Sequence, residues 1–254
     1  MRVTATELNS LIATNGDIKL GCVVDTNALF AASTPSDNLN EWAETVFTNL
    51  HNLGIPAYTN LNIRSEFLEL QRRVLIPEGL VSFYDEKDKK TLSLPLNTQL
   101  SQLKSKKDRA TREDRLFKFG EQRIKYFRNL FATSDNTNAW ELFCADFLSP
   151  YISTAWEDTI ETLNIKFAGT RAIESREFFN RAPNWKDMAD IIGRFGIGSA
   201  DAMIVNFFLC SNFKLIVTGD EDVVYAVERL SNGTKFVLVD GKEQSRLQLG
   251  GRAS

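Results

Sequence analysis

The sequence predicts an α/β protein with a central parallel sheet and an added helical segment. Short apolar runs alternate with amphipathic helical patterns near the start of the chain and again near its end, and such alternation is typical of parallel sheets. The first apolar run ends in consecutive apolar residues, as expected for a strand covered on both faces. Between the two regions the strand pattern fades, and charged helical patterns replace it.

The first region has the order strand, helix, strand, helix. We expect these elements over 18–24, 42–53, 55–58 and 63–74. Gly54 follows the first helix, as is common just beyond a helix end, and either Asn60 or Asn62 can cap the second. The first strand ends at Asp25, so an acidic side chain is expected at an edge of the sheet.

The second region has two helices, a strand, a third helix and a last strand. We expect them over 185–195, 199–211, 214–218, 221–230 and 235–239. The run Gly196-Ile197-Gly198 separates the two helices. The expected organisation is therefore a discontinuous domain over 1–80 and 185–240, a helical insertion over 81–184 and a C-terminal tail over 241–254.

The composition is that of a folded globular protein. Of 254 residues, 43% are hydrophobic and 25% charged, and the formal net charge of −3 shows no global basic excess that would indicate a nucleic acid or a membrane as partner. The three cysteines lack zinc or redox-pair spacing, so we expect buried free thiols. Without a signal-like start or an apolar run near 20 residues, we expect a cytoplasmic protein with no membrane partner.

Four acidic side chains fall where the predicted sheet would gather them. Asp25 and Asp220 each follow a strand, and ligands of open α/β sheets bind outside the carboxyl ends of the strands. Glu66 lies in the first turns of a helix, and Asp201 begins a helix that is otherwise apolar. Burial of an unpaired carboxylate is costly. Converging carboxylates suit hard divalent cations, and such sites favour phosphodiester hydrolysis.

Each acid also has an ordinary structural explanation. Asp25 can cap the turn after its strand, Asp201 can be a first-turn acid favoured by the helix dipole, and Glu66 can be a solvated helix residue. Asp220 and Asp222 can form a simple capping cluster. The functional interpretation is favoured by the positions of the four acids taken together.

The residues around these acids resemble the motifs of PIN-domain nucleases. The matching segments, in chain order, are Val23–Leu29 with Asp25, Ser65–Glu69 with Glu66, Ala200–Val205 with Asp201, and Leu215–Asp220, which ends in Thr-x-Asp. No single motif is specific, and the signal comes from four motifs in order with matching strand and helix contexts. The resemblance covers about 1–80 and 185–240.

The resemblance implies a three-layer α/β/α domain that cleaves RNA, with water as the nucleophile and Mg²⁺ or Mn²⁺ as the cofactor. The metal ligands that it implies are Asp25, Glu66, Asp201 and Asp220, with Asp222 as an additional candidate. Asn27 and Thr218 would orient the acids or the scissile phosphate.

The partner implied by the resemblance is a nucleic acid, RNA before DNA. Many members of the family are toxins of toxin–antitoxin pairs, so an antitoxin-like protein is a further candidate partner. A second copy of the chain is another candidate. The chain departs from the small single-domain members in its helical insertion.

The helical insertion contains a basic segment. Between residues 85 and 130 there are thirteen Lys and Arg against seven Asp and Glu. The candidate nucleic-acid-binding residues are Lys104, Arg109, Arg112, Arg115 and Lys118. Interleaved acids favour the alternative of a solvated face with pairs four residues apart. The aromatic residues Tyr126, Phe127 and Phe131 and the four tryptophans are expected to pack in the core.

Two other functions compete with the nuclease interpretation, and the sequence speaks against the first. In an aspartyl-phosphate phosphatase the residue after the first strand would be the nucleophile, but a second acid is then expected two residues later, where this chain has Asn27. A non-catalytic RNA-binding or scaffold protein with the same fold is the alternative from another class. The presence of all four acids favours the metal-dependent nuclease, most simply an endoribonuclease.

Overall fold

The sheet of this protein is entirely parallel, as expected. The computed structural model describes residues 1–132, 138–169 and 177–241. The strands are β1 (Arg2–Val3), β2 (Cys22–Val24), β3 (Ala57–Thr59), β4 (Ile165–Phe167), β5 (Leu215–Val217) and β6 (Phe236–Leu238), in the order β1-β6-β5-β2-β3-β4. This confirms an α/β fold with a central parallel sheet.

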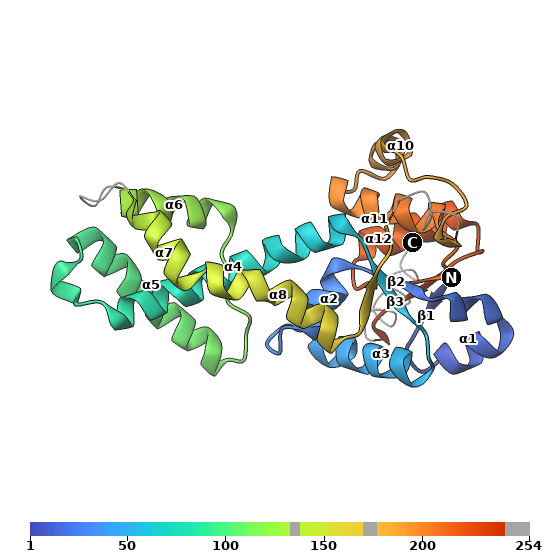
Figure 1. Ribbon diagram of the computed structural model, residues 1–254, viewed down its shortest axis with the longest axis horizontal. Helices are drawn as coiled ribbons and strands as arrows, with labels where there is room; N and C mark the ends of the chain where they lie inside the picture. Colours follow the sequence, from blue (N-terminus) through green and yellow to red (C-terminus); the bar gives the residue numbers. More distant parts are fainter. Residues whose placement is uncertain (133–137, 170–176, 242–254) are drawn as a thin grey trace, which may run out of the picture. The chain divides into compact units, whose positions relative to one another are not determined.

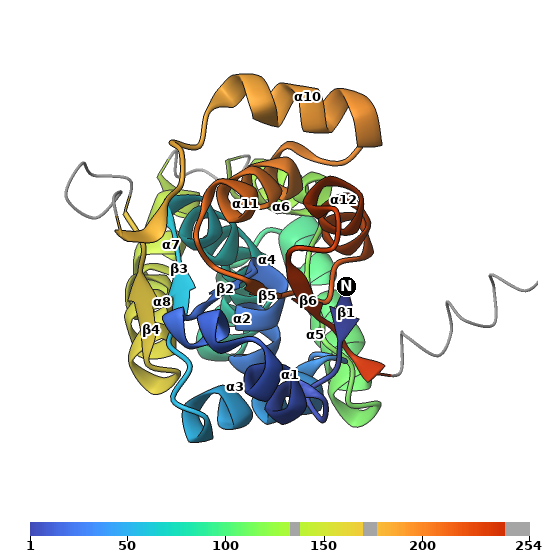
Figure 2. The same ribbon diagram turned by 90° about the vertical axis from the view of Figure 1, so that its right-hand side faces the viewer.

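Helices lie on both faces of the sheet. The α-helices are α1 (Leu8–Thr14), α2 (Thr26–Ala32), α3 (Asn40–Asn52), α4 (Leu61–Glu86), α5 (Leu94–Arg112), α6 (Glu121–Ala132), α7 (Ala139–Phe147), α8 (Ser149–Thr162), α10 (Trp185–Phe195), α11 (Ser199–Cys210) and α12 (Glu221–Ser231) (Figure 1). Helices α11 and α12 cover one face, and α1 and α3 cover the other (Figure 2). In the first unit, these four helices therefore form the two outer layers around the sheet.

The strand order reverses direction between β2 and β5. The chain moves from β2 to β3 on one side of this pair, and from β5 to β6 on the other. Since parallel crossovers are right-handed, α3 and α12 must cover opposite faces, as Figure 2 shows. Ligands of open α/β sheets bind at such a switch point, outside the carboxyl ends of the strands.

The sheet differs from the sequence expectation in three strands. The expected strand over 18–24 is shortened to β2, because a 3₁₀-helix (Gly16–Leu20) precedes it. Gly21 turns the chain with φ of 133°, and a Cβ there would lie 2.6 Å from the carbonyl oxygen of Pro56. Strands β1 and β4 were not expected, because each is short and lies at an edge of the sheet.

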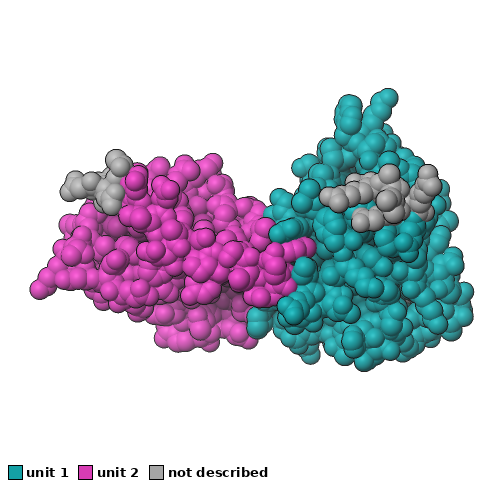
Figure 3. Space-filling model, viewed as in Figure 1, with its two compact units in different colours: residues 1–35, 39–67, 159–254 teal, residues 36–38, 68–158 magenta. Residues whose placement is uncertain are grey.

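The chain divides into two compact units (Figure 3). The first contains 1–35, 39–67 and 159–254, and the second contains 36–38 and 68–158. These bounds differ from the expected insertion over 81–184, because α4 continues from one unit into the other and β4 belongs to the sheet. Of the expected tail, residues from 242 onward lie outside the described part of the chain.

The second unit has its own apolar core. Phe127, Phe131 and Phe143 are at most 2% exposed there. Tyr126 was expected in this core but is 39% exposed. The charged helical pattern of the insertion is interrupted after α5. Asp114 has a positive φ of 47° there, and the backbone N–H groups of Asp114 and Arg115 bond the carbonyls of Thr111 and Ala110. This is a Schellman ending, which satisfies the last carbonyls of a helix.

The cysteines are free thiols, as expected. Cys22 and Cys210 are buried, and Cys144 is half-buried. Among the described helices, none is by itself long and apolar enough to cross a membrane, and only the bent pair α10 and α11 meets the length and composition criteria jointly.

Candidate active site

The switch point of the sheet gathers acidic residues from two neighbouring strands. Strand β2 is followed directly by Asp25, and β5 is followed by Thr218, Gly219 and Asp220. Strands β2 and β5 pair in register from Cys22 with Leu215 to Val24 with Val217. The expected proximity of these two strand ends is therefore confirmed.

Asp25 is buried and hydrogen-bonded on both oxygens. It is the N-cap of α2, where its Oδ1 accepts a 2.6 Å hydrogen bond from the backbone N–H of Thr26. Its Oδ2 accepts a 2.6 Å hydrogen bond from the Thr218 hydroxyl. Burial raises the pKa of Asp25 to about 7; the charges of Glu66 and Asp220 also raise it, and the two hydrogen bonds oppose the rise. Near neutral pH this carboxyl group is therefore poised between its charged and neutral forms.

Glu66 reaches the site from α4 through a hydrogen bond with Thr26. The hydroxyl of Thr26 donates to Oε2 of Glu66 at 2.7 Å. Asn60 starts α4, because its Oδ1 accepts hydrogen bonds from the backbone N–H groups of Asn62 and Ile63. Glu66 therefore lies in the second turn of a helix that begins at the end of β3.

Asp201 lies in the first turn of α11 and faces back toward the start of that helix. Burial raises the pKa of Asp201 to about 6, and the charges of Asp220, Glu66 and Asp222 raise it further, against a hydrogen bond from the backbone of Gly198. A Cβ on Gly198 would lie only 2.8 Å from Oδ2 of Asp201. The side chain of Asp201 thus takes the space that Gly198 leaves free.

The loop after β5 is held by Asn27 and Thr218. The backbone N–H of Gly219 donates to Oδ1 of Asn27 at 3.0 Å, and Nδ2 of Asn27 lies 3.4 Å from the Thr218 hydroxyl. The backbone N–H of Asp220 donates to the same hydroxyl at 3.0 Å. Asp220 in turn caps α12 by accepting a 2.8 Å hydrogen bond from the backbone N–H of Asp222. Both Asn27 and Thr218 therefore position the acids.

Two of the four acids act electrostatically on the other two. Glu66 and Asp220 each raise the pKa of both Asp25 and Asp201. Within the described ranges, however, no three His, Cys, Asp or Glu side chains form a group that could hold a metal ion as they stand. Their chemistry still suits a hard cation, because Mg²⁺ binds through one or two carboxylates and keeps several waters.

The five basic candidates lie in the second unit, and two of them form ion pairs. Lys104 contacts Asp85, and Arg115 contacts Glu113. Arg109, Arg112 and Lys118 are exposed. The two ion pairs favour the solvated-face interpretation for Lys104 and Arg115, and they leave Arg109, Arg112 and Lys118 as the candidates for phosphate contacts.

The roles of Thr26 and Gly198 are not evident from the sequence. Thr26 is next to Asp25, and its hydroxyl links the first acid to the second; only the fold shows that link, because Glu66 is 40 residues away. Gly198 was identified as part of a helix break but not as the place where Asp201 folds back. Trp185 was expected in the core, but it is 74% exposed.

Comparison of the chain with protein-family models, with curated proteins and with solved structures finds no match.

Proposed function

We propose that this protein is a divalent-metal-dependent nuclease of the PIN type, most simply an endoribonuclease. The observation that carries the proposal is the placement of Asp25 and Asp220 at the switch point of a parallel sheet, where Thr218 bonds both of them and Thr26 bonds Glu66. Asp25 and Asp201 both have raised pKa values, to which Glu66 and Asp220 contribute. Such repulsion costs stability, and the gathering of acids is understandable if a cation neutralises them.

The proposed cofactor is Mg²⁺ or Mn²⁺, held by Asp25, Glu66, Asp201 and Asp220. When bound, such a cation lowers the pKa of a water and stabilises charge on the leaving oxygen of a phosphodiester. The protein's own contribution is positioning: Thr218 and Thr26 fix the Asp25 carboxylate, and Asn27 fixes the loop that carries Asp220. Asp222, on the exposed first turn of α12, is the additional ligand candidate.

A non-catalytic binding protein is the second candidate, and one observation favours it. Asp25 and Asp220 cap α2 and α12, and Asp201 accepts a hydrogen bond from the backbone at the start of α11. Helix N-termini favour acids without any metal. The two functions differ in whether removal of a single carboxylate abolishes a metal-dependent activity.

The test is cleavage of labelled RNA and single-stranded DNA of mixed sequence with Mg²⁺, Mn²⁺ or EDTA. Asp25→Asn should lower cleavage by more than about 100-fold, since loss of even an outer partner of a metal site costs up to that amount. The amide can still accept from the Thr26 backbone, so the fold should be kept. The matched control is Asp17→Asn, which removes an exposed acid of the same unit.

Metal-dependent cutting that Asp25→Asn abolishes and Asp17→Asn preserves would establish the nuclease and identify its polymer. Full activity in Asp25→Asn would refute the assignment of this residue. No cutting under any condition would favour the binding protein.

A further inference from the structure

Three exposed apolar side chains line one pocket of the first unit. Leu61, Phe167 and Trp185 are 67%, 53% and 74% exposed. The pocket has a volume of about 540 Å³, which is in the range of ligand-binding pockets. Exposed apolar side chains scattered singly are ordinary, whereas several around one hollow indicate a binding surface.

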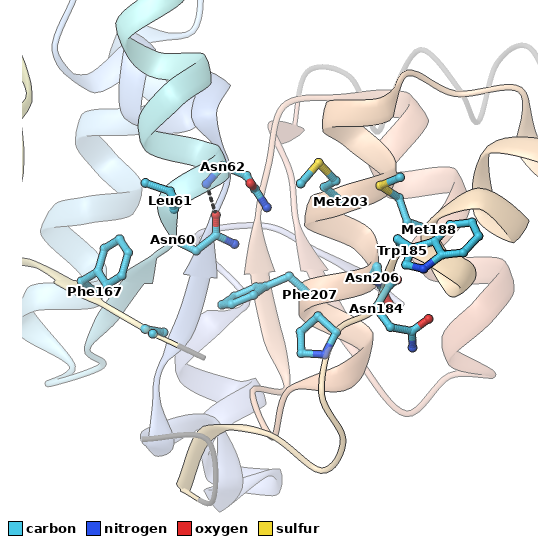
Figure 4. Close-up of a pocket in the computed structure, with 13 residues that line it drawn as sticks. Asn60, Leu61, Asn62, Phe167, Asn184, Trp185, Met188, Met203, Asn206 and Phe207 are labelled. Atoms are coloured by element: carbon cyan, nitrogen blue, oxygen red, sulfur yellow. Dashed lines mark hydrogen bonds between the residues drawn. The ribbon is translucent and has the colours of Figure 1, made fainter. Parts of the chain in front are cut away.

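The pocket is lined by two helices, α4 and α11, that also carry acids of the candidate active site. Asn62 lines the pocket, and Glu66 follows four residues later on the same face of the helix, about 6 Å away. Figure 4 shows Asn62 pointing toward Met203, which lines the pocket from α11, the helix that also carries Asp201. A chain bound at the acids can therefore place one of its groups in this pocket.

The lining is uncharged and combines aromatic rings with amides. None of its residues is Asp, Glu, Lys, Arg or His, so the pocket offers nothing to neutralise a phosphate. Phe167 and Trp185 stand on opposite sides of it, with Phe207 between them (Figure 4). This arrangement suits a flat, uncharged ring with polar edges.

Asn60 supplies a hydrogen-bond donor that has no acceptor. Its Oδ1 is engaged by the start of α4, at 2.9 Å from the backbone nitrogen of Asn62 and 3.1 Å from that of Ile63. That bonding fixes the amide, and Nδ2 is buried with no hydrogen-bond partner in the described structure. In Figure 4 this nitrogen is on the side of the amide that faces Phe207. A buried donor left unpaired is costly, and an acceptor on a ligand would satisfy it.

We propose that this pocket binds an unpaired base of a single-stranded nucleic acid whose backbone lies at the four acids. Phe167 and Trp185 offer rings on which the base stacks, and Asn60 donates to its polar edge. Every base has a π-face and edge acceptors, so stacking gives affinity without strict sequence choice. A base within a duplex is stacked and paired and cannot enter. This inference rests on the proposed function and specifies its substrate as single-stranded.

Binding to the full-length Asp25→Asn variant in Mg²⁺ tests the pocket without cleavage. The probes are a labelled uridine hexanucleotide and the same backbone without bases, followed by fluorescence anisotropy. Adding Trp185→Ala should weaken binding of the uridine probe by about tenfold, as expected for loss of one stacked base, and leave the abasic probe unchanged. Trp185→Phe should restore most of the affinity. Phe167→Ala, on a different element, should act like Trp185→Ala.

The control variant is Tyr151→Ala, an exposed aromatic residue of the second unit that does not line this pocket. It should change neither affinity. Equal affinity of the two probes, or uridine binding unaffected by both pocket variants, would overturn the base site and point to a protein segment as the occupant. The cleavage assay tests the nuclease proposal separately. Base-dependent binding without cleavage would support the base-binding pocket and contradict the proposed nuclease activity.

Discussion

At the scale of single residues, the protonation of Asp25 links stability to pH. Its pKa is raised to about 7 in the folded protein, mainly by burial, from an ordinary value of 3.8. Between these values the folded state holds more protons than the unfolded state, so the free energy of unfolding falls as pH rises from about 4 to 7. Asp201, with a pKa raised to about 6, contributes in the same direction.

This linkage predicts how the melting temperature changes in EDTA. The wild type should lose stability from about pH 4 to pH 7, and Asp25→Asn should lose less, because it removes the largest titrating contribution. Mg²⁺ should raise the melting temperature at pH 7.5 more than at pH 5, since cation binding requires deprotonated carboxylates. Parallel curves for the two proteins in EDTA would contradict the raised pKa.

A second prediction for a single residue concerns the effect of Gly198 on cleavage. Its φ of −62° suits any residue, so only the Oδ2 of Asp201, 2.8 Å from the position of a Cβ, requires glycine there. Gly198→Ala should displace the Asp201 carboxylate and lower cleavage by about 10- to 100-fold, because small misplacements of acting groups are that costly. The melting temperature should change little, since a side-chain end can move.

The matched control for Gly198 is Gly193→Ala in α10, where a Cβ would meet nothing within 4 Å. It should stabilise the protein by about 1 kcal/mol through helix propensity and leave cleavage unchanged. If Gly198→Ala also retained wild-type cleavage, Asp201 would not act at its observed position.

At the scale of elements, Lys235 joins the end of α11 to the start of β6. Its buried Nζ donates to the backbone carbonyls of Phe208, Ser211 and Phe213 at 2.6, 3.0 and 2.8 Å. Lys235→Met keeps the stem but leaves these carbonyls without this donor, which should destabilise the protein by about 2 kcal/mol. Urea unfolding measures the loss. Lys214→Met is the control, and an equal effect of the two would show that the carbonyl contacts contribute nothing.

Most elements could be predicted because their signals are local. The start of α4 could be predicted from the capping side chain of Asn60. The break between α10 and α11 could be predicted from Gly196, which has a positive φ of 68°. Strand β4 could not be predicted, because only Ile165 of its three residues is buried, and its pairing with β3 involves residues more than 100 positions away.

At the scale of the whole molecule, the basic segment predicts salt-dependent binding to nucleic acid. If Arg109, Arg112 and Arg115 contact phosphates, replacing all three by Ala should make log affinity fall less steeply with log salt, by roughly one unit of slope for each lost contact. Anisotropy titrations at salt concentrations from about 50 to about 200 mM measure this slope. The charge-matched control removes the exposed Lys19, Arg194 and Arg229 of the first unit.

An unchanged slope in the triple variant would assign this surface to the solvated face that the ion pairs of Lys104 and Arg115 already favour. In that case the acids and the uncharged pocket of the first unit would account for nucleic-acid recognition without the second unit.

The fold class and the order of the acids could both be predicted from local features of the amino-acid sequence. Caps, periodicity and apolar runs act between neighbours in the chain. They are enough to predict that strands end at Asp25 and just before Asp220, and that helices start near Glu66 and Asp201. Three other features became visible only in the folded chain: Thr26 bonds Glu66, Gly198 gives room to Asp201, and Trp185 is exposed beside a pocket. These features depend on distant segments meeting, and no local pattern records which segments those are.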